Sequence, residues 1–415
     1  MSFKRAWTPL RHQMFRDVWI AALASNVGTW MQTVGASWLM TTLSISPLMV
    51  ALVQTASSLP NFLVSLPAGA MADMVDRRRM LLVTQTWMLL AAALLGFLSM
   101  AGWVGPWWLL ALTFALGLGA AANGPAWQAM IPDLVPHEDL PSAVALNSVQ
   151  FNIARAIGPA LAGLLLAATS SGIVFLVNAV SFLGVIIVLW RQAAIPRKHP
   201  RSQSRVWAAL REGLRYVMKS HAIRTVLIRQ GTFVIMASGL WSLLPVVASR
   251  ELHGSALAYG ILLGCLGAGA VAGAAVLAPL RAAYSADWVA VTGTLLFAFA
   301  TAGLAVLRSF GPLAIAMLAG GIAWMTTMST FNVFTQTSAP GWVKARVLGV
   351  YLLMFQASLA IGSTIWGAVA ERISVRGSLL LSAAALVAGL AATLRWPLIH
   401  NVVEATRQEG VPESV

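Results

Sequence analysis

Twelve runs of mainly apolar residues, each long enough to cross a lipid bilayer, dominate this 415-residue sequence. A spanning α-helix needs about 20 such residues. The composition agrees, because 59% of the residues are hydrophobic and only 10% are charged, against about 25% in soluble domains. The runs cover residues 17–40, 47–71, 80–102, 106–130, 146–169, 172–190, 222–248, 255–280, 288–308, 311–335, 347–370 and 375–397. They predict an all-α integral membrane protein and exclude a soluble enzyme, a disordered chain and a coiled coil.

The basic residues fall mainly on one side of the predicted membrane. If the N-terminus is cytoplasmic, 21 of the 27 Lys and Arg residues lie in cytoplasmic segments and four lie on the other side. Because cytoplasmic loops carry an excess of Lys and Arg, this bias predicts that both termini are cytoplasmic. The net charge of +14 then reflects orientation in the membrane, and we expect no nucleic-acid partner.

The chain divides into two halves of six runs each, separated by a basic linker. The predicted parts are an N-terminal six-helix bundle (1–190), a cytoplasmic linker (191–221), a C-terminal six-helix bundle (222–397) and a cytoplasmic tail (398–415). Within the linker, Val206, Leu210, Leu214 and Val217 share one helical face. This pattern predicts an amphipathic helix that lies on the cytoplasmic leaflet.

An internal repeat supports the division into halves. Three residues recur at an offset of 204, after the fourth run and in the fifth run of each half. They are Pro136, Gly158 and Gly163 in the first half and Pro340, Gly362 and Gly367 in the second. The repeat predicts two pseudo-symmetric bundles of six transmembrane helices, with a substrate site between them as in transporters built from parallel repeats.

The loop after the second run carries a signature. Its residues Gly69, Asp73, Arg77 and Arg78 resemble the loop between spans two and three of the major facilitator superfamily, although Asp76 stands where that loop has Gly. The resemblance implies a gating latch, in which the arginines pair with Asp73, or with Asp133 after the fourth run, and hold the halves together on the cytoplasmic side. Gly69 is expected to allow close helix approach. The alternative is that Arg77–Arg79 only orient the loop.

A second motif lies in the fifth run, where Gly158, Pro159 and Gly163 resemble the antiporter motif of exporting branches of the superfamily. Taken whole, the chain is similar to the bacterial branch that includes the enterobactin exporter, the transmembrane secretion effectors. The resemblance implies the major facilitator fold, location in the cell inner membrane and export of a small molecule. The motif also has a purely structural interpretation, and we expect it to produce a helix kink with close packing as well.

Polar residues inside the apolar runs indicate a cavity, because polar groups are costly in a bilayer. Several recur at helical spacing, as along the first run. The candidate cavity residues are Asn26, Trp30, Thr33, Gln54, Asn61, Trp127, Asn152, Arg155, Arg229, Trp324 and Gln356. For some of these residues the alternative is a hydrogen bond to a neighbouring helix.

Arg155 is the most informative of them, because it lies near the middle of a run and none of the thirteen acidic residues lies mid-run. Two interpretations stay open. Arg155 binds an anionic or catechol-bearing substrate, or it is a structural residue, capped by backbone carbonyls, beside Gly158 and Pro159. The lack of mid-run acids leaves Asp17, at the start of the first run, as the candidate proton site.

The sequence thus predicts a secondary active transporter that exports a siderophore, drug or secondary metabolite by alternating access. No phosphate-binding loop, His cluster or Cys-based metal site is found, so we predict no cofactor and an energy source in a proton or other ion gradient. The expected partners are the small-molecule substrate, the ion and the lipid bilayer, and the expected state is a monomer. The alternatives are a solute importer, a membrane-embedded lipid-modifying enzyme and a non-transporting scaffold.

Overall fold

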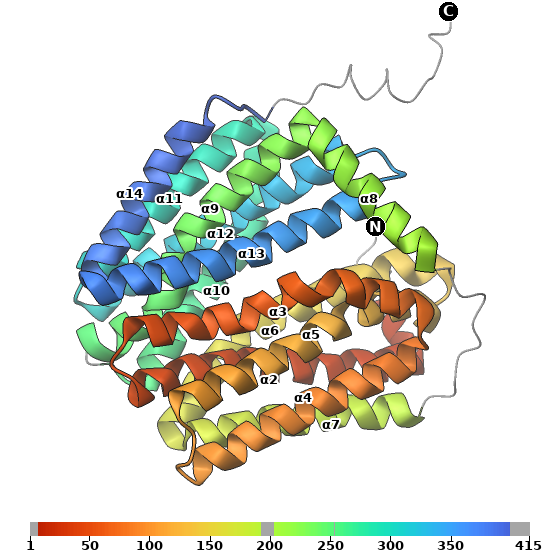
Figure 1. Ribbon diagram of the computed structural model, residues 1–415, viewed down its shortest axis with the longest axis horizontal. Helices are drawn as coiled ribbons and strands as arrows, with labels where there is room; N and C mark the ends of the chain where they lie inside the picture. Colours follow the sequence, from red (N-terminus) through yellow and green to blue (C-terminus); the bar gives the residue numbers. More distant parts are fainter. Residues whose placement is uncertain (1–6, 192–202, 253, 399–415) are drawn as a thin grey trace, which may run out of the picture.

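Twelve long helices form two bundles in the computed structural model, which describes residues 7–191, 203–252 and 254–398 (Figure 1). The first bundle contains α2 (Gln13–Leu43), α3 (Pro47–Met74), α4 (Arg77–Met100), α5 (Pro106–Leu134), α6 (Leu140–Ala168) and α7 (Ser171–Arg191). The second contains α9 (His221–Val246), α10 (Ala256–Ala283), α11 (Ala286–Val306), α12 (Phe310–Ser338), α13 (Lys344–Arg372) and α14 (Val375–Thr393). The described part also contains α8 (Gln203–Lys219) and the short helical turns η1 (Thr8–Arg11), η2 (His137–Asp139) and η3 (Val247–Glu251), and it contains no strand.

Eleven of the helices in the described part are long and apolar enough to cross a membrane. The remaining bundle helix, α2, is 31 residues long but more polar, since it carries Asn26, Gln32 and Thr33. These polar side chains line an internal cavity described below. The prediction of an all-α membrane protein with two six-helix bundles is confirmed. The hydropathy of α2 is lowered by its polar residues that face the interior of the first bundle.

The two bundles have the same pattern of helix contacts. In the first, α2 packs on α6 and α7, α3 packs on α5, and α4 packs on α7. The counterparts in the second are α9 on α13 and α14, α10 on α12, and α11 on α14. Between the bundles, α6 packs on α10 and α3 packs on α13, and these two crossings are also equivalent. The packing therefore has the pseudo-twofold symmetry that the repeat predicts.

The repeated glycines explain how these contacts form. A Cβ atom on Gly158 would lie 2.5 Å from Cβ of Trp30 on α2, and one on Gly362 would meet Ser238 and Ile235 of α9. The first glycine of each repeat thus packs a helix within its own bundle. Because small residues let helix backbones approach closely, they favour such contacts in a membrane.

The second glycine of each repeat packs against the other bundle. A Cβ atom on Gly163 would lie 3.1 Å from the carbonyl oxygen of Ala256, and one on Gly260 would lie 2.8 Å from the carbonyl oxygen of Pro159. On the equivalent crossing, a Cβ atom on Gly367 would lie 2.5 Å from Cβ of Ala51. The antiporter-like motif of α6 therefore marks the place where the two bundles cross.

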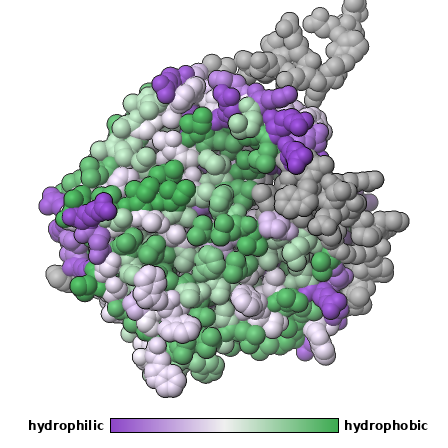
Figure 2. Space-filling view, in the orientation of Figure 1, coloured by the Kyte–Doolittle hydropathy of each residue, from purple (hydrophilic) through white to green (hydrophobic). Residues whose placement is uncertain are grey.

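Large apolar side chains cover the outside of the bundles. Leu90, Phe97, Val180, Phe299 and Ile315 are among those that are exposed. Figure 2 shows apolar residues across the middle of one face and hydrophilic residues at its edges. An exposed apolar surface of this size indicates contact with lipid rather than water.

The amphipathic linker helix is present as α8 (Gln203–Lys219), which runs across the end of the molecule where α2 begins (Figure 1). We call this end, which also contains Arg77–Arg79 and the start of α13, the basic end. Val217 is buried and Leu214 is exposed, while the side chains of Val206 and Leu210, residues 192–202 of the linker and residues 399–415 of the tail lie outside the described set. Glu212 pairs with Arg346 of α13 at 2.7 Å, so α8 is fixed to the second bundle.

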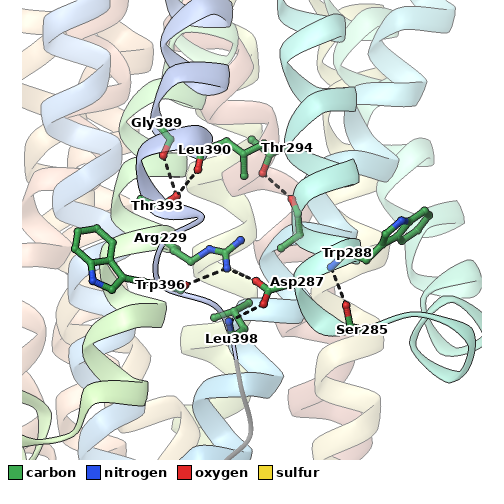
Figure 3. Close-up of polar contacts among 11 residues, drawn as sticks. Arg229, Ser285, Asp287, Trp288, Thr294, Gly389, Leu390, Thr393, Trp396 and Leu398 are labelled. Atoms are coloured by element: carbon green, nitrogen blue, oxygen red, sulfur yellow. Dashed lines mark hydrogen bonds and ion pairs between the residues drawn. The ribbon is translucent and has the colours of Figure 1, made fainter.

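A buried ion pair holds the second bundle together at the basic end (Figure 3). Arg229 of α9, whose side chain is only 2% exposed, pairs with Asp287 of α11. The carboxylate of Asp287 also accepts a hydrogen bond from the backbone N–H of Leu398 at 2.8 Å, and Arg229 donates to the carbonyl of Trp396 at 3.4 Å. These contacts tie α9, α11 and the segment after α14 to one another.

We expect the substitution Asp287→Asn to lower the free energy of unfolding by about 3–5 kcal/mol, because it leaves the buried charge of Arg229 without a counter-ion. The more exposed pair of Arg77 and Asp133 offers a matched control, and Asp133→Asn should cost about 0–1 kcal/mol. Melting temperatures of the purified variants in detergent measure the difference. Equal shifts for the two variants would contradict the structural role of Asp287.

Candidate functional site

One end of the molecule, opposite the basic end, is closed by polar contacts between the bundles. Arg250 of η3 donates to the carbonyl oxygens of Ser44 at 2.7 Å and Ile45 at 2.5 Å, just after the C-terminus of α2. A cation is favoured there because the C-terminal end of a helix carries partial negative charge. Arg250 therefore joins the second bundle to the first.

Glu371, at the end of α13, makes the complementary contact. Its carboxylate accepts from the hydroxyl of Ser46 at 2.7 Å and from the backbone N–H of Leu48 at 3.4 Å, at the N-terminus of α3. A carboxylate is favoured at this end of a helix. We call Arg250 and Glu371 with their partners the outer latch.

Further contacts seal the bundles below the outer latch. The hydroxyl of Thr55 on α3 donates to the carbonyl of Ala360 at 3.1 Å and lies 3.0 Å from the hydroxyl of Thr364, both on α13. The rings of Trp38 on α2 and Tyr259 on α10 stack with centroids 6.1 Å apart. Together with the glycine crossings, these contacts close the half of the interface that is nearer the outer latch.

A cavity of about 410 Å³ lies inside the first bundle, and we call it the amide cavity. All six helices of the bundle contribute to its wall, and none of its lining residues carries a charge. The polar residues that line it are Ser25, Asn26, Thr29, Gln32, Thr33, Ser57, Asn61, Gln85, Thr113, Asn123, Trp127, Gln128, Asn147 and Asn178. Such a wall offers both hydrogen-bond donors and acceptors to a neutral polar group.

Hydrogen bonds order part of this wall. The pairs are Asn178 to Gln32 at 3.3 Å, Gln85 to Asn123 at 3.3 Å and Trp127 to Asn147 at 3.3 Å. Other polar atoms remain without a hydrogen-bond partner in the described part of the chain, among them Nε2 of Gln32, Oε1 of Gln85 and Oγ1 of Thr113. Buried polar atoms without partners are costly, so these atoms are available to a ligand or to water.

A second cavity of about 410 Å³ lies between the bundles, and we call it the arginine cavity. Helix α6 of the first bundle and helices α10, α12 and α13 of the second line it. The lining residues are Arg155, Leu277, Arg281, Trp324, Met328, Ser329, Asn332, Val333, Tyr351, Leu352 and Phe355. Two arginines and no carboxylate are present in this wall.

Arg155 lies between aromatic rings of both bundles. Its guanidinium carbon is 5.8 Å from the ring centroid of Trp30 on α2 and 5.8 Å from that of Trp241 on α9. Cation–π contacts of this kind stabilise a desolvated guanidinium but leave its N–H donors free. Among the described residues, no carboxylate or backbone carbonyl accepts a hydrogen bond from Arg155, so the backbone cap that a structural role would require is not found there.

The predicted cavity residues separate into groups. Asn26, Thr33, Asn61 and Trp127 line the amide cavity, and Arg155 and Trp324 line the arginine cavity. Trp30 lies where the two adjoin, because its ring contacts Phe151 of the amide cavity as well as Arg155. These residues therefore meet around the centre of the molecule.

Four other predicted residues are placed elsewhere. Gln54 donates to Ser58 at 3.0 Å, and Asn152 donates to the carbonyl of Ser148 at 2.8 Å, so both bond within their own helices. Gln356 is half-buried on α13 and lines neither cavity. Arg229 is held by Asp287 inside the second bundle, so its charge is neutralised away from both cavities.

The signature loop is arranged differently from the expected latch. Arg77 pairs with Asp133 at 2.7 Å, as one of the two expected pairings predicts, and Arg78 donates to the carbonyl of Leu189 at 2.7 Å. All of these residues belong to the first bundle, so the contacts do not join the halves in this structure. A Cβ atom on Gly69 would meet open space, which corrects the expectation of close packing there, and the side chain of Asp73 lies outside the described set.

Asp17 lies at the basic end of α2. Its side chain is 44% exposed and its carboxylate is 3.6 Å from the guanidinium of Arg16. The carboxylate therefore reaches water and a neighbouring cation and is not enclosed by apolar groups.

Several contributors to the site lie outside the sequence predictions. Arg281 resembles any other basic residue at a helix end that the positive-inside pattern explains, so nothing in the sequence marks it as a cavity residue. Arg250 and Glu371 lie near loops, where charges are ordinary. Gln32 falls off the polar stripe of its run but is buried and faces the amide cavity, because the cavity is wider than one stripe.

Comparison with known proteins agrees with this architecture. The sequence profile of the transmembrane secretion effectors, a family of major facilitator transporters, matches residues 4–412. The chain belongs to this family. This transporter is 26% identical to the staphyloferrin A transporter of Staphylococcus aureus, over 83% of its own length and 86% of the relative. It is also 26% identical to the multidrug efflux pump Tap of Mycolicibacterium fortuitum, over 90% and 93% of the two chains.

Solved structures show the same fold. A bacterial homologue of the human lysosomal transporter Spinster, in an inward-facing and unoccupied conformation, has a TM-score of 0.76 with 15% sequence identity. The match covers 94% of this chain and 97% of that one. The family and its relatives are transporters, so the alternative of a lipid-modifying enzyme has no support.

We expect the double substitution Arg250→Ala and Glu371→Gln to weaken the outer latch by about 1–2 kcal/mol, which shifts the closed-to-open ratio about 5- to 30-fold. A cysteine at Thr55, introduced with Cys265→Ser, should then react faster with a membrane-impermeant maleimide. The pair of Arg308 and Glu251, at 3.0 Å within the second bundle, offers the control Arg308→Ala with Glu251→Gln. Unchanged labelling in the latch variant, or equal acceleration in the control, would contradict the latch.

Proposed function

We propose that this transporter is a proton-coupled exporter of small organic molecules that works by alternating access. The observation that carries the proposal is the asymmetry of the bundle interface. The outer latch and both glycine crossings close one end, while the arginine cavity lies on the other side of the crossings between α6, α10, α12 and α13. A two-bundle transporter that moves a substrate by alternating access must pass through states that are closed at one end and open at the other.

We assign the basic end to the cytoplasm, because Lys and Arg concentrate there. The transporter then lies in the cell inner membrane with both termini inside, and the structure represents its inward-open state. It acts as a monomer, since each chain contains both bundles and both cavities. In this state a substrate enters the arginine cavity from the cytoplasm.

Export is the direction favoured by the relatives, one of which is a multidrug efflux pump. A siderophore or drug is therefore the proposed class of cargo. Coupling to protons requires a group that binds and releases them, and the lining residues of the two cavities include no carboxylate. The proposed carrier remains Asp17, which water reaches in the inward-open state. Import is the competing direction, and one experiment separates the two.

Everted membrane vesicles test the proposal, because their exposed face is the cytoplasmic one. With respiration acidifying the interior, we expect the vesicles to accumulate staphyloferrin A or a fluorescent drug against its gradient, and a protonophore to abolish the accumulation. Gly163→Leu should lose transport, since the added side chain separates α6 from α10, and Asp17→Asn should lose uphill transport only. Energised accumulation in right-side-out vesicles alone would identify an importer and contradict the proposal.

A further inference from the structure

Arg281 differs from those arginines at the basic end that have a partner, among them Arg229, whose Nη2 is also buried and unpaired but whose Nη1 binds Asp287. Arg77 and Arg346 pair with carboxylates, and Arg78 donates to backbone carbonyls. Arg281, in the last turn of α10, has a buried Nη2 atom with no hydrogen-bond partner in the described part of the chain. Orientation in the membrane explains a basic residue at this place, but it does not explain a donor that is removed from water and left unpaired.

Arg155 and Arg281 face the same cavity. Arg155 lies near the middle of the 29-residue helix α6, and Arg281 lies at the basic end of α10. Along α12 the cavity wall runs from Trp324 to Asn332, which is about 12 Å at 1.5 Å per residue. The cavity is therefore long enough for one ligand to present separate groups to the two guanidinium groups.

The surroundings add hydrogen-bond donors and no competing anion. The indole Nε1–H of Trp241, whose ring lies 5.8 Å from Arg155, is buried without a partner among the described residues. The lining of the arginine cavity contains no Asp or Glu. Because a guanidinium group has only donors and matches a planar carboxylate with two parallel hydrogen bonds, the missing partner is an acceptor of that shape.

We propose that the arginine cavity is a binding site for a polycarboxylate cargo, in which Arg155 and Arg281 each bind one carboxylate. The uncharged remainder of a larger cargo reaches the amide cavity past Trp30, where amides and hydroxyls bind neutral polar groups. The inference rests on the proposed transport function and adds to it the chemical class of the cargo. A phosphate-bearing lipid headgroup shares part of this chemistry, and the experiment separates the two sources.

Binding of tricarballylate, a small tricarboxylate, to the purified protein in detergent tests the proposal. Titration calorimetry should detect tricarballylate and not its neutral triamide. Arg155→Gln and Arg281→Gln should each weaken binding about ten- to a hundredfold, since each removes a charge-assisted hydrogen bond. The corresponding Lys substitutions should recover part of the affinity. Arg346→Gln, which removes a basic residue paired with Glu212 outside the cavity, is the matched control and should bind normally.

Several results would overturn the two-arginine site. They are normal binding by Arg281→Gln, equal losses for acid and triamide, or binding of phosphatidylglycerol in nanodiscs without any binding of tricarballylate. Melting temperatures of the ligand-free variants show whether a loss reflects misfolding, and the Lys variants then give the decisive comparison. The binding assay needs no ion gradient. If the protein exports a drug uphill but binds no tricarboxylate, the proposed function stands and this inference is refuted. If it binds the tricarboxylate but exports nothing uphill, this inference stands and the proposed function is refuted.

Discussion

The close crossing of helices at small residues is the constraint on which the rest of the structure depends. Within a bilayer the lipid is as apolar as the helix surface, so helices associate through close packing and polar contacts rather than through burial from water. At Gly163 with Gly260, and at Gly367 with Ala51, the backbones of opposite bundles come so near that any larger side chain would separate them. These two crossings determine which end of the interface is closed and where the arginine cavity begins.

The charged side chains around these crossings are placed according to the free-energy cost of removing each charge from water. Arg229 is buried, and Asp287 neutralises it within one bundle. Arg250 and Glu371 use the partial charges at the ends of α2 and α3, so the outer latch needs no buried counter-ion. In the described part of the chain, the two arginines of the arginine cavity have no carboxylate partner, and no carboxylate lines that cavity. A membrane protein keeps such unpaired charge where water or a ligand reaches it.

The sequence predicts the fold well because membrane-spanning helices must be long and apolar, which makes them easy to recognise. Apolar runs of about 20 residues identify nearly every helix, and the offset between Gly158 and Gly362 identifies the pseudo-symmetry before any contact is known. Side-chain pairs between different helices are harder to predict from the sequence. The partner of Arg229 is Asp287, which the sequence places at the edge of another run, and only the fold brings them together. Gly69 looks like a packing glycine in its motif, but a Cβ atom there would meet open space, and the motif alone does not reveal this. From the sequence alone, Arg281 looks like any basic residue that sets the orientation of the protein in the membrane. Only the structure of the cavity wall separates it from them.

The central claim is that two rigid bundles rock about the crossings, and distances between spin labels measure this directly. In a Cys265→Ser background, one labelled pair at Arg79 and Ala345 spans the basic end, and another at Thr42 and Ser309 spans the outer end. A third pair, at Arg79 and Thr42, lies within the first bundle. When substrate and pH are varied in nanodiscs, alternating access predicts that the basic-end distance shortens as the outer-end distance lengthens, while the third stays constant. Distances that change together, or a change within the bundle as large as those between bundles, would contradict it.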